Sequence, residues 1–162
     1  MEFLLLDRKF KLVDDVLYSF YKHGNSKTDK WYIVKLSFNK DGYKRFAFRL
    51  EGKFKQFYYH RVVYYANNPQ WDIYDNSINN LIDHIDGEIT NNHISNLRNV
   101  SQQENTFNTR CKGYSFNKEI GKYQARIILN GKKNSIGYYD SEDEAHQAYL
   151  NKKEVLHIII QR

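Results

Sequence analysis

The chain has 162 residues, of which 41% are hydrophobic and 16% aromatic, so a wholly disordered protein is excluded and one domain or two small ones are expected. No apolar run reaches the roughly 18 residues that a membrane span needs. The single cysteine, Cys111, excludes an intramolecular disulfide and a multi-cysteine zinc site, which favours a reducing compartment.

The net charge of +6 is distributed unevenly along the chain. Residues 1–60 carry 13 basic and 7 acidic side chains, residues 61–109 carry 2 and 6, and residues 110–162 carry 10 and 6. An acidic centre between basic flanks suits a metal site held against nucleic acid, because a cation removes the repulsion between carboxylates and phosphates. From charge alone, ordinary solvated surface explains the pattern equally well.

Strand-forming residues dominate much of the first 60 positions. The segments 31–38, 43–50 and 54–60 are rich in β-branched and aromatic residues, and turn-forming residues separate them. Residues 7–30 show no clear pattern. The apolar stretch 61–66 predicts a short helix that ends before the only proline, Pro69.

The centre of the chain predicts a strand, a loop, a second strand and a helix. The first strand is expected to end at Asp83 and His84, immediately before turn-forming residues. Ser101 and Glu104 have the spacing of a capping box, which predicts a helix to about residue 110 with Asn105 in its first turns.

The tail predicts three strands and a helix. The segments 114–117, 123–130 and 134–139 have strand composition, and Gly-containing turns separate them. Ser141 and Glu144 form a second capping box that opens a helix through about residue 153. The boundary between centre and tail, near 110–113, is inferred from the end of the preceding helix.

The central residues suit hydrolysis of a phosphodiester. His84 fits a general base, because the ordinary pKa of histidine is about 6.5. Asp83 and Asn105 offer the oxygen ligands that Mg²⁺ or Mn²⁺ prefers. Adjacent strand residues point to opposite faces, so the joint use of Asp83 and His84 requires a strand end or a bulge.

These residues carry a resemblance to a known family. The segments 83–87 (Asp-His-Ile-Asp-Gly), 91–98 (Asn-Asn-His-Ile-Ser-Asn-Leu-Arg) and 103–105 (Gln-Glu-Asn) resemble HNH endonucleases. They most resemble the phage and intron-encoded homing enzymes of the ββα-metal nucleases. Segment 60–63 (His-Arg-Val-Val) resembles a His-Arg-Leu-Val segment often found upstream in that branch. The likeness covers roughly residues 45–110.

The resemblance implies a role for each residue of the motif. His84 would activate water, and Asp83 and Asn105 would hold one Mg²⁺ or Mn²⁺ ion. The last letter of the name HNH stands for a histidine, and Asn105 occupies that position in this chain. Asn96 would be structural and would fix the loop that orients His84. Arg98 is a candidate DNA contact, with pairing to an acidic residue as the alternative.

The tail has a resemblance of its own. The segments 113–116, 121–127, 136–140 and 144–149 resemble an AP2-type DNA-binding domain over about residues 112–152. Such a domain lays a three-stranded sheet into the major groove with its helix packed behind. The candidate DNA contacts are Lys122, Arg126, Lys132 and Lys133.

Together these observations predict an α+β protein with three regions. Residues 1–59 would form a β-rich DNA-binding region, residues 60–110 the HNH ββα-metal core, and residues 111–162 the AP2-like domain. The expected function is site-specific, metal-dependent cleavage of double-stranded DNA by a monomer that nicks one strand. The expected setting is the cytoplasm of a bacterial host, with a phage- or intron-encoded gene.

Two alternatives remain open at this stage. One is a catalytically inactive, sequence-specific DNA-binding or regulatory protein, which the basic flanks and the AP2-like tail would suit. The other is a nuclease that acts on RNA or degrades nucleic acid without sequence preference.

Overall fold

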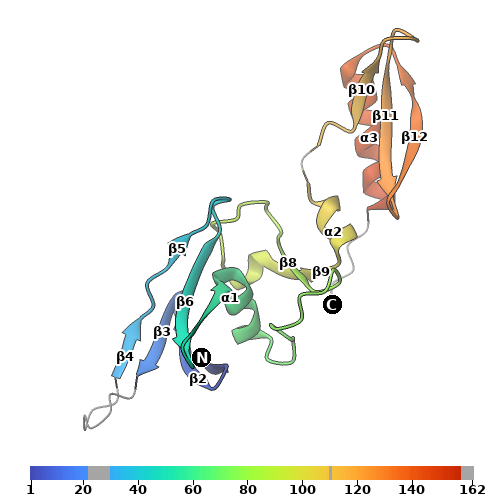
Figure 1. The fold of residues 1–162 in the computed structure, drawn as a ribbon. Coiled ribbons are helices and arrows are strands. Elements are labelled where there is room, and N and C mark those ends of the chain that lie inside the picture. The colour runs from blue at the N-terminus through green and yellow to red at the C-terminus, as the bar shows by residue number, and fades with distance from the viewer. Residues whose placement is uncertain (22–29, 110, 158–162) are drawn as a thin grey trace. The chain divides into compact units, whose positions relative to one another are not determined.

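The computed structural model describes residues 1–21, 30–109 and 111–157, and the chain divides into two compact units (Figure 1). The first unit comprises Met1–Ser77 and Ile82–Asn99, and the second comprises Ile78–Leu81 and Val100–Arg162. The fold is α+β, with small sheets and few helices, as predicted. The predicted nuclease core, 60–110, contributes to both units, and its separate function stays a prediction.

The first unit begins with a four-stranded antiparallel sheet that the sequence did not reveal. Its strands are β1 (Glu2–Leu5), β2 (Arg8–Val13), β3 (Val16–Tyr21) and β4 (Lys30–Ile33), paired in that order. Two-residue turns at Leu6-Asp7 and Asp14-Asp15 connect the first three strands, and all four turn residues have positive φ. Such turns match the twist of a hairpin, but they usually contain Gly or Asn, which explains why they were missed.

A second antiparallel sheet and a helix follow in the same unit. The strands are β5 (Ser37–Phe38), β6 (Lys44–Leu50) and β7 (Lys53–Tyr58). The predicted strand 31–38 is divided between β4 and β5, which belong to different sheets. Helix α1 (Tyr59–Asn67) starts directly after β7, so the predicted strand end at 59–60 was wrong. Buried residues at positions 59, 62, 63 and 66 have helical spacing, which explains the change.

The core of the first unit joins both sheets to α1. The Phe10 ring centroid lies 5.7 Å from that of Phe46 and 5.5 Å from that of Phe48, across the two sheets. Val62 and Val63 of α1 are almost fully buried in the same cluster. Each such side chain contributes about 1.5–3 kcal/mol through burial, so this core provides a rigid support for the central motif.

The central motif has the predicted order of elements. Strand β8 (Leu81–His84) pairs with β9 (Leu97–Val100), and a short 3₁₀ turn, η1 (Ile94–Asn96), precedes β9. Helix α2 (Gln102–Phe107) opens with the predicted capping box of Ser101 and Glu104. It ends at Phe107, three residues before the predicted end.

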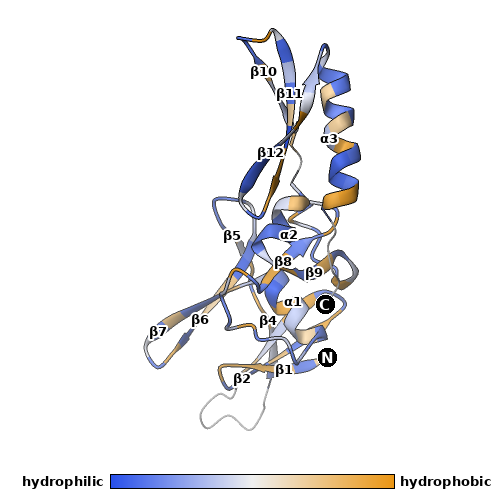
Figure 2. Ribbon diagram, turned by 90° about the vertical axis from the view of Figure 1, so that its right-hand side faces the viewer, coloured by the Kyte–Doolittle hydropathy of each residue, from blue (hydrophilic) through white to orange (hydrophobic). Residues whose placement is uncertain are grey.

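The second unit carries a three-stranded antiparallel sheet with a helix on one face (Figure 1). The strands are β10 (Tyr114–Asn117), β11 (Lys122–Leu129) and β12 (Lys132–Tyr139), and the helix is α3 (Glu142–Leu156). Figure 2 shows hydrophobic and hydrophilic residues interspersed along α3. Ala125 and Ile127 of β11 are buried, as are Ala145 and Tyr149 of α3. These elements confirm the strands and the capped helix predicted for the tail.

Candidate functional site

The first two candidate site residues lie at the end of strand β8. Asp83 and His84 are its last two residues, and their exposed fractions are only 8% and 4%. The backbone then turns, with Gly87 N–H donating to the His84 carbonyl at 2.9 Å. Gly87 has a φ of 76°, a conformation that favours glycine. The two polar side chains therefore lie at a strand end, as their joint use requires.

A hydrogen bond fixes one nitrogen of the His84 ring. His84 Nε2 lies 3.3 Å from Asn92 Oδ1, while Asn92 Nδ2 donates to the Thr90 carbonyl at 2.9 Å. The Thr90 bond sets the orientation of the amide, so its oxygen faces the histidine and accepts from Nε2–H. In the neutral ring Nδ1 then carries the lone pair, which makes it the basic nitrogen. The motif segment 91–98 includes Asn92 but predicts no separate role for it.

Two further rings pack against His84. Its ring centroid lies 5.2 Å from that of His60 and 6.1 Å from that of Tyr43. Burial raises the pKa of Tyr43, and the charge of Asp83 adds to this effect. Burial also lowers the pKa of His60 to about 3. The sequence offered the His-Arg-Val-Val segment as a family likeness only, without a role for His60.

Asn96 holds together the loop after His84. Its Oδ1 accepts from Asp86 N–H at 3.0 Å, and its Nδ2 donates to Asp86 Oδ1 and to the Asn91 carbonyl, both at 2.9 Å. The Asn96 carbonyl accepts from Ile85 N–H at 2.8 Å. Hydrogen bonds from Glu88 N–H, Asn91 and Asn96 lower the pKa of Asp86. These contacts fit a structural role for Asn96 and a turn-shaping role for Asp86.

Arg98 forms an ion pair with Asp83. Its Nε and Nη2 both donate to Asp83 Oδ2, at 2.9 and 2.7 Å. The side chains are 19% and 9% exposed, so the pair is shielded from water. Of the two roles considered for Arg98, the structure contains the pairing with an acidic residue, and a contact with DNA stays a prediction.

Asn105 belongs to the second unit, whereas Asp83 belongs to the first. It lies in the first turn of α2, where its N–H donates to the Ser101 carbonyl at 2.9 Å. Its joint use with Asp83 on one ion stays a prediction. Within the described ranges no cluster of three or more His, Cys, Asp or Glu side chains suits a metal. A carboxylate and an amide still fit Mg²⁺, which usually keeps several waters and takes phosphate oxygens as ligands.

The predicted DNA contacts of the tail lie on the sheet of the second unit. Lys122 forms an exposed ion pair with Asp140, with Nζ 3.0 Å from Oδ1. Arg126 donates to the Ser115 hydroxyl. Lys132 and Lys133 open strand β12 and are exposed. Exposed pairs contribute little to stability, so Lys122 can exchange its partner for a phosphate at small cost.

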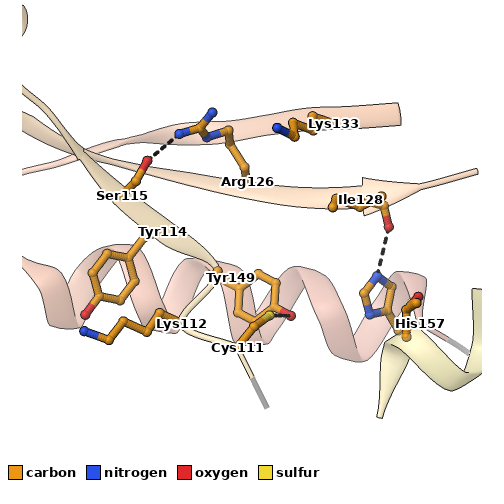
Figure 3. A pocket seen from close by; sticks show the side chains of 11 residues that line it. Cys111, Lys112, Tyr114, Ser115, Arg126, Ile128, Lys133, Tyr149 and His157 are labelled. Carbon is orange, nitrogen blue, oxygen red and sulfur yellow. Dashed lines mark hydrogen bonds between the residues drawn. The ribbon is translucent and has the colours of Figure 1, made fainter. Parts of the chain in front are cut away.

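A cavity of about 480 Å³ lies beside two of these basic residues. Figure 3 shows Arg126 and Lys133 on the strands of the sheet and Tyr149 on α3, beside Cys111. Cys111 Sγ lies 2.9 Å from the Tyr149 hydroxyl oxygen and closes part of the floor. The cavity combines basic groups with an apolar base.

Comparisons with known proteins give a limited likeness. No protein-family model matches the sequence, and no curated protein matches it. A solved structure described as DNA binding and cleavage by the HNH homing endonuclease I-HmuI is 30% identical, with a TM-score of 0.43. The match covers 61% of this chain and 50% of that one, so this chain matches about half of that protein's length.

Within the described segments, no helix has the length and apolar character needed to cross a membrane.

Proposed function

We propose that the chain is a site-specific, metal-dependent DNA endonuclease of the HNH homing type. The observation that supports this best is the orientation of His84, which is buried at the end of β8 with its Nε2 bonded to Asn92. A general base must present one defined nitrogen to water, and the bond at Nε2 supports Nδ1 in that role. The loop held by Asn96 keeps the strand end, and hence the ring, in place.

In this proposal each residue of the site has a different role in hydrolysis. His84 accepts the proton of the attacking water at Nδ1, and Asn92 holds the opposite side of the ring as charge develops. Asp83 and Asn105 would hold Mg²⁺ or Mn²⁺, which when bound stabilises negative charge on the phosphate and the leaving oxygen. One such site cuts one strand, so a monomer nicks duplex DNA.

Binding of DNA is assigned to the two basic flanks. The sheet of the second unit, with Lys122, Arg126, Lys132 and Lys133, would contact the duplex in the manner of an AP2-type domain. The first 60 residues carry 13 basic side chains and would provide the second contact. Phosphate contacts supply affinity, and contacts to base edges supply specificity.

The Arg98–Asp83 ion pair favours a second candidate function. A guanidinium bonded to the proposed metal ligand neutralises the charge that would attract a cation. A protein that keeps this pair when bound to DNA would be a sequence-specific binding protein without cleavage activity.

A cleavage assay distinguishes the two functions. Sequencing of the ends from a genomic digest identifies a target, and supercoiled plasmid carrying it is then incubated with protein and Mg²⁺ or Mn²⁺. Nicked product is expected from the wild type. His84→Ala should reduce the rate by about 100-fold or more, the usual contribution of a general base. Asp83→Ala should lose the cleavage that Mg²⁺ or Mn²⁺ supports.

The control is His146→Ala, which removes a histidine of the second unit bonded to the Lys112 carbonyl. It should cleave like the wild type. Cleavage by His84→Ala at the wild-type rate would refute the assignment of the base. Tight, salt-sensitive binding without cleavage across several divalent cations would support the binding protein instead.

A further inference from the structure

His60 gives the proposed nuclease site a second buried imidazole. It is the second residue of α1 and is 7% exposed. Its ring meets that of His84 edge to face, with centroids 5.2 Å apart and an interplanar angle of 62°. Tyr43 and Tyr58 pack on the same ring at 5.4 and 5.7 Å. These four rings, Tyr43, Tyr58, His60 and His84, form a cluster within the first unit.

One nitrogen of His60 is left without a hydrogen bond. Its Nδ1 is buried and has no partner in the part of the chain that the structure describes. A buried polar atom in this state costs about 1–3 kcal/mol. A phenyl ring would keep the three ring contacts without that cost. A polar atom retained at a loss of stability is typical of a functional position.

The charge state of His60 suits a place beside a general base. Burial is the main cause that holds its pKa at about 3, so the ring is neutral near pH 7. A cation here would oppose the positive charge that His84 gains when it takes a proton from water. The neutral imidazole offers a hydrogen-bonding nitrogen without that repulsion.

We propose that His60 is a positioning residue for His84: its ring fixes the plane of the His84 imidazole, and its Nδ1 is reserved for a hydrogen bond that forms in the DNA-bound state. Hydrogen bonds of active sites are often incomplete in the free protein and form only in the complex, which accounts for the unpartnered atom. This inference rests on the proposed nuclease function.

The substitution His60→Phe tests the role of the nitrogen apart from that of the ring, because phenylalanine keeps an aromatic ring and has no nitrogen in it. It should leave the unfolding temperature unchanged or higher, since a buried unpartnered atom is removed. The affinity for target DNA should also be unchanged, while the single-turnover cleavage rate falls about tenfold or more. A purely structural histidine would not combine equal or greater stability with slower cleavage. His146→Phe is the matched control and should change neither the rate nor the affinity.

A second readout does not depend on cleavage. Nitrogen NMR of the wild type should show His84 in a single tautomer with the proton on Nε2. In His60→Leu, which lacks the aromatic ring, the His84 signals should shift toward a mixture of tautomers, whereas in His60→Phe they should match the wild type. Wild-type cleavage rates in His60→Phe, or unchanged His84 signals in His60→Leu, would overturn the inference. If the wild type cuts no DNA with any divalent cation, the proposed function fails, and the NMR signals still decide whether His60 positions His84.

A second pair of variants tests the same proposal if His60→Phe does not fold. His60→Asn places polar atoms near the position of Nδ1, whereas His60→Leu has similar size and no polar atom. The Asn variant should cleave several-fold faster than the Leu variant. Equal rates in the two would refute a role for the nitrogen.

Discussion

Asp83, the proposed cation ligand, is bonded to a guanidinium in the free protein. Both donors of Arg98 reach the same oxygen, Oδ2. The ion pair and a bound cation would compete by charge, because a guanidinium within 3 Å of the carboxylate reduces its attraction for a cation.

The substitution Arg98→Met tests this competition. Loss of the guanidinium leaves a buried carboxylate without its cationic partner, so the free energy of unfolding should fall by about 3 kcal/mol. Added Mn²⁺ should then raise the unfolding temperature more in the variant than in the wild type. Thermal unfolding measured with and without Mn²⁺ decides this.

Arg49→Met serves as the control for Arg98→Met. It removes one positive charge from an exposed position on β6, where the guanidinium lies 5.0 Å from the Phe54 ring centroid. Its response to Mn²⁺ should match that of the wild type. An equal Mn²⁺ effect in Arg98→Met and the wild type would show that Arg98 does not compete with a cation for Asp83.

At the scale of elements, the junction between Cys111 and β10 depends on one glycine. Gly113 has a φ of 73°, and a Cβ there would lie 2.0 Å from Cγ of Tyr149. The Tyr149 ring is 4% exposed and forms the core between the sheet and α3. Any larger residue must therefore displace that ring as well as adopt an unfavourable backbone conformation.

Gly113→Ala should destabilise the second unit by about 3 kcal/mol, the combined cost of overpacking and backbone strain. Amide hydrogen exchange of β11 is the measurement, with β6 in the first unit as reference. Gly121→Ala is the control, because its φ is 70° but nothing lies within 4 Å of its Cβ. Gly121→Ala should accelerate amide exchange in β11 about tenfold, whereas Gly113→Ala should accelerate it about a hundredfold. Equal effects would rule out the Tyr149 clash.

Elements with local markers could be predicted from the sequence. The capping boxes at Ser101 and Ser141 marked the starts of α2 and α3, and glycine-containing turns marked the tail hairpins. The first three strands could not be recognised, because their turns use Leu6-Asp7 and Asp14-Asp15 in conformations that these residues rarely adopt. A hairpin closed by atypical turn residues leaves only its strand composition as a guide.

The residues of the candidate site also differ in whether the sequence could predict them. Asp83, His84 and Asn96 are close in sequence, and a motif with defined spacing identified them. Tyr43 and His60 reach His84 through the packing of α1 and the second sheet, with sequence separations of 41 and 24 residues. Contacts of this kind depend on the assembled core, so no local pattern predicts them.

At the scale of the whole molecule, the uneven charge predicts how binding depends on salt. Basic residues gather in the two flanks, and the centre is acidic. If Lys133 contacts a phosphate, Lys133→Gln should weaken binding and reduce the slope of log K against log salt by about 0.9. Binding of labelled target DNA at several salt concentrations measures this slope.

Lys152→Gln is the comparison for Lys133→Gln. Lys152 is exposed on α3, the helix expected to face away from DNA, and its loss removes the same charge from the same unit. The slope should change little. A similar decrease in both variants would mean that total charge, rather than a contact from the sheet, governs binding.

The division of the chain affects where it can be joined to another protein. Residues Ile78–Leu81 belong to the second unit although they precede His84, and the Ile78 carbonyl accepts from Gln102 N–H at 2.6 Å. A chimera joined at residue 100 would therefore separate a short segment from the unit it packs with. A junction after α2, near residue 112, keeps that segment with Gln102 but separates Phe107 from His157, whose ring centroids lie 3.9 Å apart. A sheet and helix joined there must therefore cover Phe107 in place of His157.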